Sequence, residues 1–76
     1  MTTEEKIAQR KKIGGMIAEI RKSKGISLRQ LSDMCGVTFQ NINKVENGRY
    51  NVSVDILAKI CDALGCEFRI TEKAEG

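Results

Sequence analysis

One stretch of the chain, residues 27–49, contains two short amphipathic patterns separated by a glycine. The first pattern places four apolar side chains at helical spacing, and therefore on one helix face: Leu28, Leu31, Met34 and Cys35. Gly36 ends this run, as expected for a residue that tolerates left-handed backbone angles just past a helix. Thr38 can cap a second helix, which Asn47-Gly48 closes. The stretch therefore predicts two short helices joined by a tight turn.

The second of these helices has an apolar face and a polar face. Ile42 and Val45 form the apolar face. The polar face carries side chains that suit base edges and phosphates and do not suit a core: Gln40, Asn41, Asn43 and Lys44. A helix-turn-helix whose second helix presents amides outward is a candidate for reading DNA.

The composition restricts the class of protein. The 76 residues fit one domain with one small core, which oligomerisation would help to stabilise. The chain is 41% hydrophobic and 30% charged, which is typical of a globular protein. It has no apolar run long enough to span a bilayer, and residues 1–12 are too polar for a signal peptide. The sequence therefore predicts a cytoplasmic protein.

The chemistry-bearing residues argue against an enzyme and against a metal site. The three cysteines, Cys35, Cys61 and Cys66, show no paired spacing and have no histidine to complete a zinc site. Buried thiols are the simpler interpretation. The chain also lacks a paired-carboxylate constellation and a phosphate-cradling glycine-rich loop, so we predict no catalytic residue, cofactor or metal.

The charge is unevenly distributed. Residues 1–24 hold seven Lys/Arg against three Glu, whereas residues 53–76 hold three Lys/Arg against five Asp/Glu. This gradient fits a polyanionic partner on the first half of the chain and a different role for the C-terminus. Solvated helix faces in proteins without a polyanionic partner produce similar net charges.

The first part of the chain carries a helical pattern. Thr2 and Glu5 form a capping-box signature. An apolar stripe follows: Ile7, Ile13, Met16, Ile17 and Ile20. Gly14-Gly15 interrupts it, at a cost of about 2 kcal/mol relative to alanine. One helix continuing to Ser23 is favoured over a short arm that hinges at the glycine pair.

A fourth helix and a strand-like tail complete the chain. Ser53 to Leu64 is predicted to be helical, with Ser53 as N-cap and Gly65 as C-cap. In residues 66–71, apolar and polar side chains then alternate with the period of a strand. The chain has no second strand to pair with this one, so we hypothesise that two copies pair their tails antiparallel in a dimer.

Two registers are possible for this pairing of Glu67, Phe68, Arg69 and Ile70. Centring on Phe68 places Glu67 opposite the partner's Arg69, which is favourable and preferred. Centring on Arg69 instead opposes Phe68 and Ile70. Residues 72–76 are expected to fray.

The ordered motifs resemble the lambda-repressor-like, or Xre-type, helix-turn-helix family of bacterial and phage regulators. The resemblance spans roughly Ile13 to Leu64. The residues that match the family pattern are Ile13-Gly14, Ile17, Arg21, Leu31, Gly36, Ile42, Val45, Glu46, Gly48, Leu57 and Ala63-Leu64-Gly65. It implies an all-α, four-helix domain, to which the sequence adds the C-terminal strand. We expect a single domain over residues 1–76, with a helical extension at 1–12 and a core at 13–65.

The resemblance also implies an ion pair between Arg21 and Glu46, which ties the first helix to the end of the recognition helix. The alternative is two solvated charges. Three positions depart from the family pattern. Leu28 stands where a phosphate-contacting glutamine is frequent, which puts that contact in doubt. Ser32 replaces a common alanine, and Val52 replaces a common proline.

In the docking geometry of such domains, the N-terminal half of the recognition helix faces the bases. That gives base-facing roles to Phe39, Gln40, Asn41 and Lys44. Phe39 either meets a thymine methyl or packs on the preceding helix. The expected phosphate contacts are Ser27, Arg29, Thr38, Asn43, Asn47, Arg49 and Asn51.

The predicted function is transcriptional regulation, more specifically repression by a dimer on a palindromic double-stranded site. A first rival is an antitoxin that binds its own operator and a toxin through the tail. A second rival is a protein interaction module that does not bind DNA. A membrane-surface role is disfavoured because the apolar stripe of the first helix is needed for the core.

Overall fold

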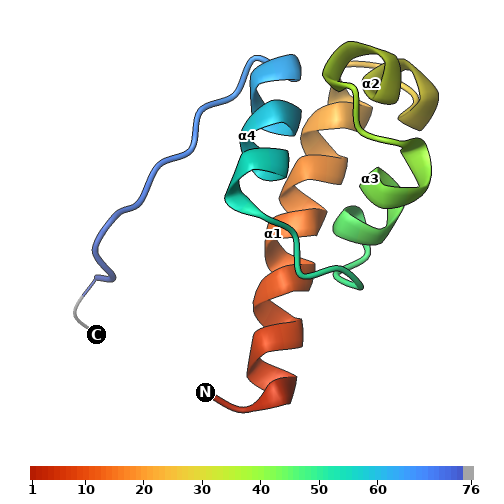
Figure 1. Cartoon of the computed structure of the whole chain (residues 1–76). Coiled ribbons are helices and arrows are strands. Elements are labelled where there is room, and N and C mark those ends of the chain that lie inside the picture. Colours follow the sequence, from red (N-terminus) through yellow and green to blue (C-terminus); the bar gives the residue numbers. More distant parts are fainter. Residues whose placement is uncertain (75–76) are drawn as a thin grey trace.

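The chain folds into four helices in the predicted order. The computed structural model describes residues 1–74, and its elements are α1 (Thr3–Ser23), α2 (Leu28–Cys35), α3 (Phe39–Glu46) and α4 (Val54–Ala63). The longest helix, α1, runs through the middle of the molecule, with α4 on one side and α2 and α3 on the other (Figure 1). The predicted four-helix, all-α architecture is confirmed.

A hydroxyl side chain starts every helix. Each one accepts a hydrogen bond from the backbone N–H three residues later: Thr2, Ser27, Thr38 and Ser53. In α1 and α2 the bond is reciprocated, because Glu5 and Gln30 accept from the backbone N–H of the cap residue. Each cap stabilises its helix by about 1 kcal/mol. Short helices such as α2 and α3 depend on such local signals and on tertiary packing.

The glycine pair does not interrupt α1, which continues through it to Ser23. Gly14 is buried, and a Cβ atom at this position would overlap the carbonyl oxygens of Val45 and Glu46. A Cβ atom on Gly15 would meet nothing within 4 Å. The first glycine therefore permits α1 to approach the backbone of α3, whereas the second has no such role.

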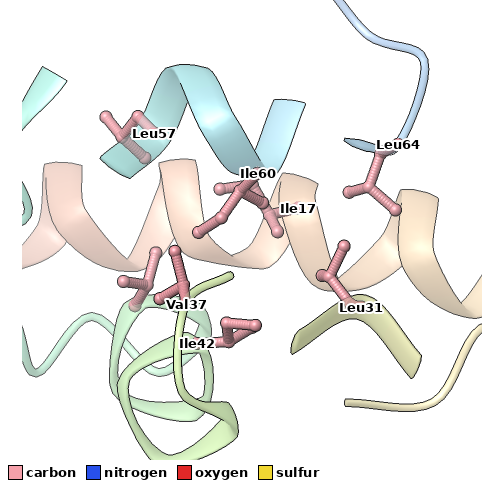
Figure 2. Packing of buried hydrophobic residues seen from close by; sticks show 8 residues of the cluster. Ile17, Leu31, Val37, Ile42, Leu57, Ile60 and Leu64 are labelled. Atoms are coloured by element: carbon pink, nitrogen blue, oxygen red, sulfur yellow. The ribbon is translucent and has the colours of Figure 1, made fainter. Parts of the chain in front are cut away.

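All four helices contribute to one small core. Its members, most of which Figure 2 labels, are Ile17, Leu31, Val37, Ile42, Val45, Leu57, Ile60 and Leu64. Ile60 of α4 lies next to Ile17 of α1, and Val37 reaches the core from the α2–α3 turn (Figure 2). Within residues 1–74, no helix is long and apolar enough to cross a bilayer.

The predicted apolar stripe of α1 is only partly used by this core. Ile17 is buried, but Ile7, Ile13 and Met16 are 36%, 39% and 56% exposed. The prediction that the core needs this stripe holds only in part, because the N-terminal part of α1 extends beyond its shorter neighbours (Figure 1) and Ile13 and Met16 line an open groove beside the tail. Met34 of α2 is also 52% exposed, although the sequence pattern placed it on the apolar face.

The segment after α4 leaves the helical body as an extended chain (Figure 1). Leu64 is the C-cap of α4, one residue before the predicted Gly65, and the Cys66 N–H donates to the Cys61 carbonyl at 2.8 Å. Residues 1–74 contain no strand, because a strand requires a pairing partner and none is present among them. The fraying predicted for residues 72–76 falls partly outside the described residues.

Candidate nucleic-acid interface

The turn between α2 and α3 sets the direction of α3. Gly36 has φ = 73°, in the left-handed region that favours glycine. Val37 is buried next to it, which anchors the turn in the core. Thr38 then starts α3 by accepting a hydrogen bond from the Asn41 N–H at 3.3 Å. The local sequence thus reverses the chain and restarts a helix within three residues.

The core holds one face of α3 and leaves the opposite face open. Ile42 and Val45 are 0% and 3% exposed. The polar side chains predicted to contact DNA lie on the other side, where Asn41 is half-buried and the rest are exposed: Gln40, Asn43, Lys44 and Asn47. Within residues 1–74, the Gln40 amide and the Lys44 ammonium have no intramolecular hydrogen bond, so both are available to a ligand.

Two of the predicted contact residues bond to each other. The Asn47 side-chain amide donates to the Asn43 carbonyl at 2.8 Å and to the Asn43 side-chain oxygen at 3.0 Å. These bonds close the last turn of α3. The free side-chain N–H₂ group of Asn43 remains able to donate to a phosphate.

The structure places Phe39 beside the second helix. Its ring is half-buried, and the Arg29 guanidinium carbon lies 4.8 Å from the ring centroid. A cation over an aromatic face is stabilised by about 0.5–1 kcal/mol at an exposed site. The contact joins α2 to the start of α3 and orients the Arg29 guanidinium near the outer face of α3.

Two further predicted phosphate contacts serve as helix caps. The Ser27 and Thr38 hydroxyl oxygens accept the backbone N–H groups of Gln30 and Asn41. Each hydroxyl keeps its own proton for donation, so capping and phosphate binding are compatible. Arg49 and Asn51 are exposed in the loop after α3.

The ion pair expected between Arg21 and Glu46 is present. The carboxylate accepts from Arg21 Nε at 2.7 Å and from Nη2 at 3.0 Å, while Nη1 donates to the Ile26 carbonyl at 2.8 Å. The two side chains are only 10% and 7% exposed. The hydrogen bond to Glu46 raises the pKa of Arg21. One guanidinium therefore connects α1, the α1–α2 loop and the last residue of α3, which fixes the orientation of α3.

A cleft beside the end of α3 was not predicted. It is lined by Ile7, Arg10, Lys11, Asn47, Gly48 and Arg49. The spacing of Ile7, Arg10 and Lys11 places them on one face of α1, but no sequence signal shows that this face meets the loop after α3. That juxtaposition depends on tertiary packing.

The three cysteines are free and half-buried, whereas the sequence favoured fully buried thiols. Burial, with a smaller contribution from Cys66, raises the pKa of the Cys61 thiol, which keeps it in the less nucleophilic protonated form. Among residues 1–74, no group of three or more His, Cys, Asp or Glu side chains is placed to hold a metal ion.

Comparison with known proteins identifies the family. The family described as Helix-turn-helix matches residues 17–70. The chain belongs to this helix-turn-helix family. Over 52 residues, it is 40% identical to an HTH-type transcriptional regulator of Methanothermobacter thermautotrophicus, covering 68% of this chain and 75% of that protein. The helix-turn-helix chain is therefore a transcriptional regulator with a DNA-binding domain.

Other members of the helix-turn-helix family support the same fold. Transcriptional regulator ClgR of Mycobacterium tuberculosis is 34% identical over 55 residues, which cover 72% of this chain and 49% of ClgR. A crystal structure of the clp gene regulator ClgR from Corynebacterium glutamicum superposes with a TM-score of 0.72 at 35% identity. The match covers 75% of this chain and 61% of that one, so the present chain spans about half to three-fifths of these relatives.

Proposed function

We propose that the chain reads a specific double-stranded DNA sequence and represses transcription by occupying a palindromic operator as a homodimer. The outer face of α3 carries this proposal. Its free amides and lysine project from a helix whose opposite face is buried and whose end is fixed by Arg21 and Glu46. Gln and Asn match adenine, and Lys matches guanine, in the major groove.

Base and backbone contacts have separable roles in this proposal. Gln40, Asn41 and Lys44 read base edges, and Phe39 supports Arg29 at the margin of the groove. The backbone contacts come from Ser27, Arg29, Thr38, Asn43, Asn47, Arg49 and Asn51. Phosphate contacts set register and affinity and carry no sequence information directly.

Selection from random duplex DNA tests the proposal directly. A recovered palindrome with half-sites about 34 Å apart supports a dimer that reads one face of the duplex. Gln40→Ala should lose about 1–3 kcal/mol of discrimination at one base pair. Arg49→Ala should weaken binding to all sequences equally. Equal loss on every sequence for Gln40→Ala would refute its reading role, and no binding at low salt would indicate a protein interaction module.

The dimer is proposed to form through the tail and the exposed face of α1. An apolar groove, here the tail groove, is lined by Ile13, Met16, Ile17, Ile20, Cys61, Cys66, Glu67, Phe68 and Arg69. Phe68 and Ile70 are 55% and 95% exposed, on a segment that has no pairing partner in the described part of the chain, residues 1–74. A second copy would supply both the missing strand and the apolar cover.

The charges on the tail fit the register centred on Phe68. Arg69 Nη2 lies 2.8 Å from Glu67 Oε1 within the chain, but the two side chains are 74% and 76% exposed. Such an exposed pair contributes little stability and can exchange for the pair between two chains. The antitoxin alternative predicts that a different protein occupies the same groove. Sedimentation of the purified chain separates these outcomes, because only a homodimer forms without a second protein.

A further inference from the structure

We infer that Arg10 and Lys11, together with Arg49, form a second backbone-binding site whose ligand is a phosphodiester of the duplex held by α3. This inference rests on the proposed function and extends the DNA footprint to the N-terminal part of α1. Its basis is the cleft between α1 and the loop after α3.

The cleft has a concentrated and uncompensated positive charge. Three of its six lining residues are Arg10, Lys11 and Arg49, and none is acidic. Within residues 1–74, the salt bridges are those of Arg21 and Arg69, so the three cations of the cleft have no carboxylate partner. Like charges held close together repel one another, and an anion that binds between them relieves that repulsion.

The fold keeps these cations together before any ligand binds. Gly48 is buried with φ = 70°, and a Cβ atom there would lie 2.5 Å from Lys11 Cγ and 2.8 Å from Lys11 N. The loop after α3 therefore rests directly on the backbone of α1. Because both walls belong to packed segments, little conformational freedom is lost when a ligand binds.

The position of the cleft selects the phosphodiester as its ligand. Asn47 is the C-cap of α3 and Arg49 follows two residues later, so the cleft begins where the recognition helix ends. A duplex in contact with α3 and Arg49 brings its backbone to this edge. Arginine forks match two phosphate oxygens, and lysine supplies a point charge. The N-terminal half of α1 projects past the α3–α4 loop at this edge (Figure 1).

The test is the salt dependence of binding to the selected operator. Arg10→Gln/Lys11→Gln removes two cations from the cleft. Lys59→Gln/Lys73→Gln is the matched control, since it removes the same charge from exposed positions on α4 and the tail. Each phosphate contact contributes about 0.9 to the slope of log K against log salt. We expect the cleft variant to lower the slope by about 1–2 per bound chain and the control variant to leave it unchanged.

Two further variants guard against a folding effect. Arg10 is half-buried, whereas Lys11 is exposed, so Lys11→Gln alone tests the charge with little risk to the fold. Arg10→Lys retains the charge and should keep most of the wild-type slope. Circular dichroism confirms that each variant is helical at the temperature of measurement.

The outcomes separate this inference from the proposed function. If the wild type ignores duplex DNA at low salt, the proposed function fails. If the wild type binds and the cleft variants keep its slope, only the second backbone site is refuted. Replacing single phosphates by uncharged methylphosphonates gives an independent readout. At least one replacement should weaken DNA binding by the wild type and leave DNA binding by Arg10→Gln/Lys11→Gln unchanged. If no phosphate position behaves in this way, the inference is overturned.

Discussion

Two surfaces of α1 differ sharply in how they are packed. The α1–α3 seam, formed by Gly14, Arg21, Val45, Glu46 and Gly48, brings backbone against backbone and encloses a nearly buried ion pair. The tail groove instead leaves Ile13 and Met16 39% and 56% exposed. The seam holds the recognition helix in one orientation within a single chain. In the proposed dimer a second copy would cover the groove, so changes in the two places should have different consequences.

The largest expected effect is at Gly14. Gly14→Ala places a Cβ atom against the carbonyl oxygen of Val45, and no side-chain rotation can relieve a clash between two backbones. We expect a loss of about 3 kcal/mol in the free energy of unfolding, measured by urea denaturation. The matched control is Gly15→Ala, whose Cβ atom meets nothing within 4 Å. It should stabilise α1 by about 0.5–1 kcal/mol.

Substitution by alanine is therefore expected to lower the free energy of unfolding at Gly14 and to raise it at the adjacent Gly15. Equal responses of the two variants would show that α1 does not approach α3 as closely as the seam requires.

The next largest effect is expected from the ion pair. Glu46→Ala leaves the Arg21 guanidinium nearly buried with only the Ile26 carbonyl as partner. The expected loss is about 2 kcal/mol in unfolding free energy. Glu67→Ala breaks an ion pair of 2.8 Å at the exposed tail, against 2.7 Å for the nearly buried pair, and should cost below about 0.5 kcal/mol. An unchanged melting temperature for Glu46→Ala would count against a stabilising role for the pair.

The smallest effect on the single chain, and the most informative one for the groove, is expected at Phe68. Phe68→Ala should leave the unfolding free energy of the monomer within about 0.5 kcal/mol, because the ring is 55% exposed. The dissociation constant of the dimer should rise tenfold or more, since each truncation removes about 1.5 kcal/mol of apolar burial. Sedimentation equilibrium measures this change.

Val54→Ala is the control for the groove, because Val54 is 75% exposed on α4 and does not line it. This variant should leave association unchanged. A wild-type chain that stays monomeric at micromolar concentration would remove the basis for the proposed dimer.

Local signals in the sequence were sufficient for the helices. Thr38, Ser53 and the Thr2–Glu5 pair were recognised as caps, and each acts as one. Capping depends on atoms three residues apart, which sequence spacing specifies directly. The outward face of α3 was predictable for the same reason, since Ile42 and Val45 define the buried side by helical periodicity.

Contacts between distant segments were not available from the same signals. Helical periodicity placed Ile13 and Met16 on the apolar face, but it gave no length for the helices that would cover them. Helix propensity likewise predicted the same destabilisation of α1 by Gly14 and by Gly15, and did not distinguish between them.

The sequence by itself therefore determined where α1, α3 and α4 start, which face of α3 is polar, and the family to which the chain belongs. Tertiary structure alone decided that Gly48 rests on Lys11, that Arg10 joins Arg49 in one cleft, and that three of the five residues of the α1 stripe stay exposed. The physical reason is the separation along the chain over which each kind of interaction acts. Caps and periodicity act within a few residues, whereas the approach of two backbones depends on the packing of the whole core.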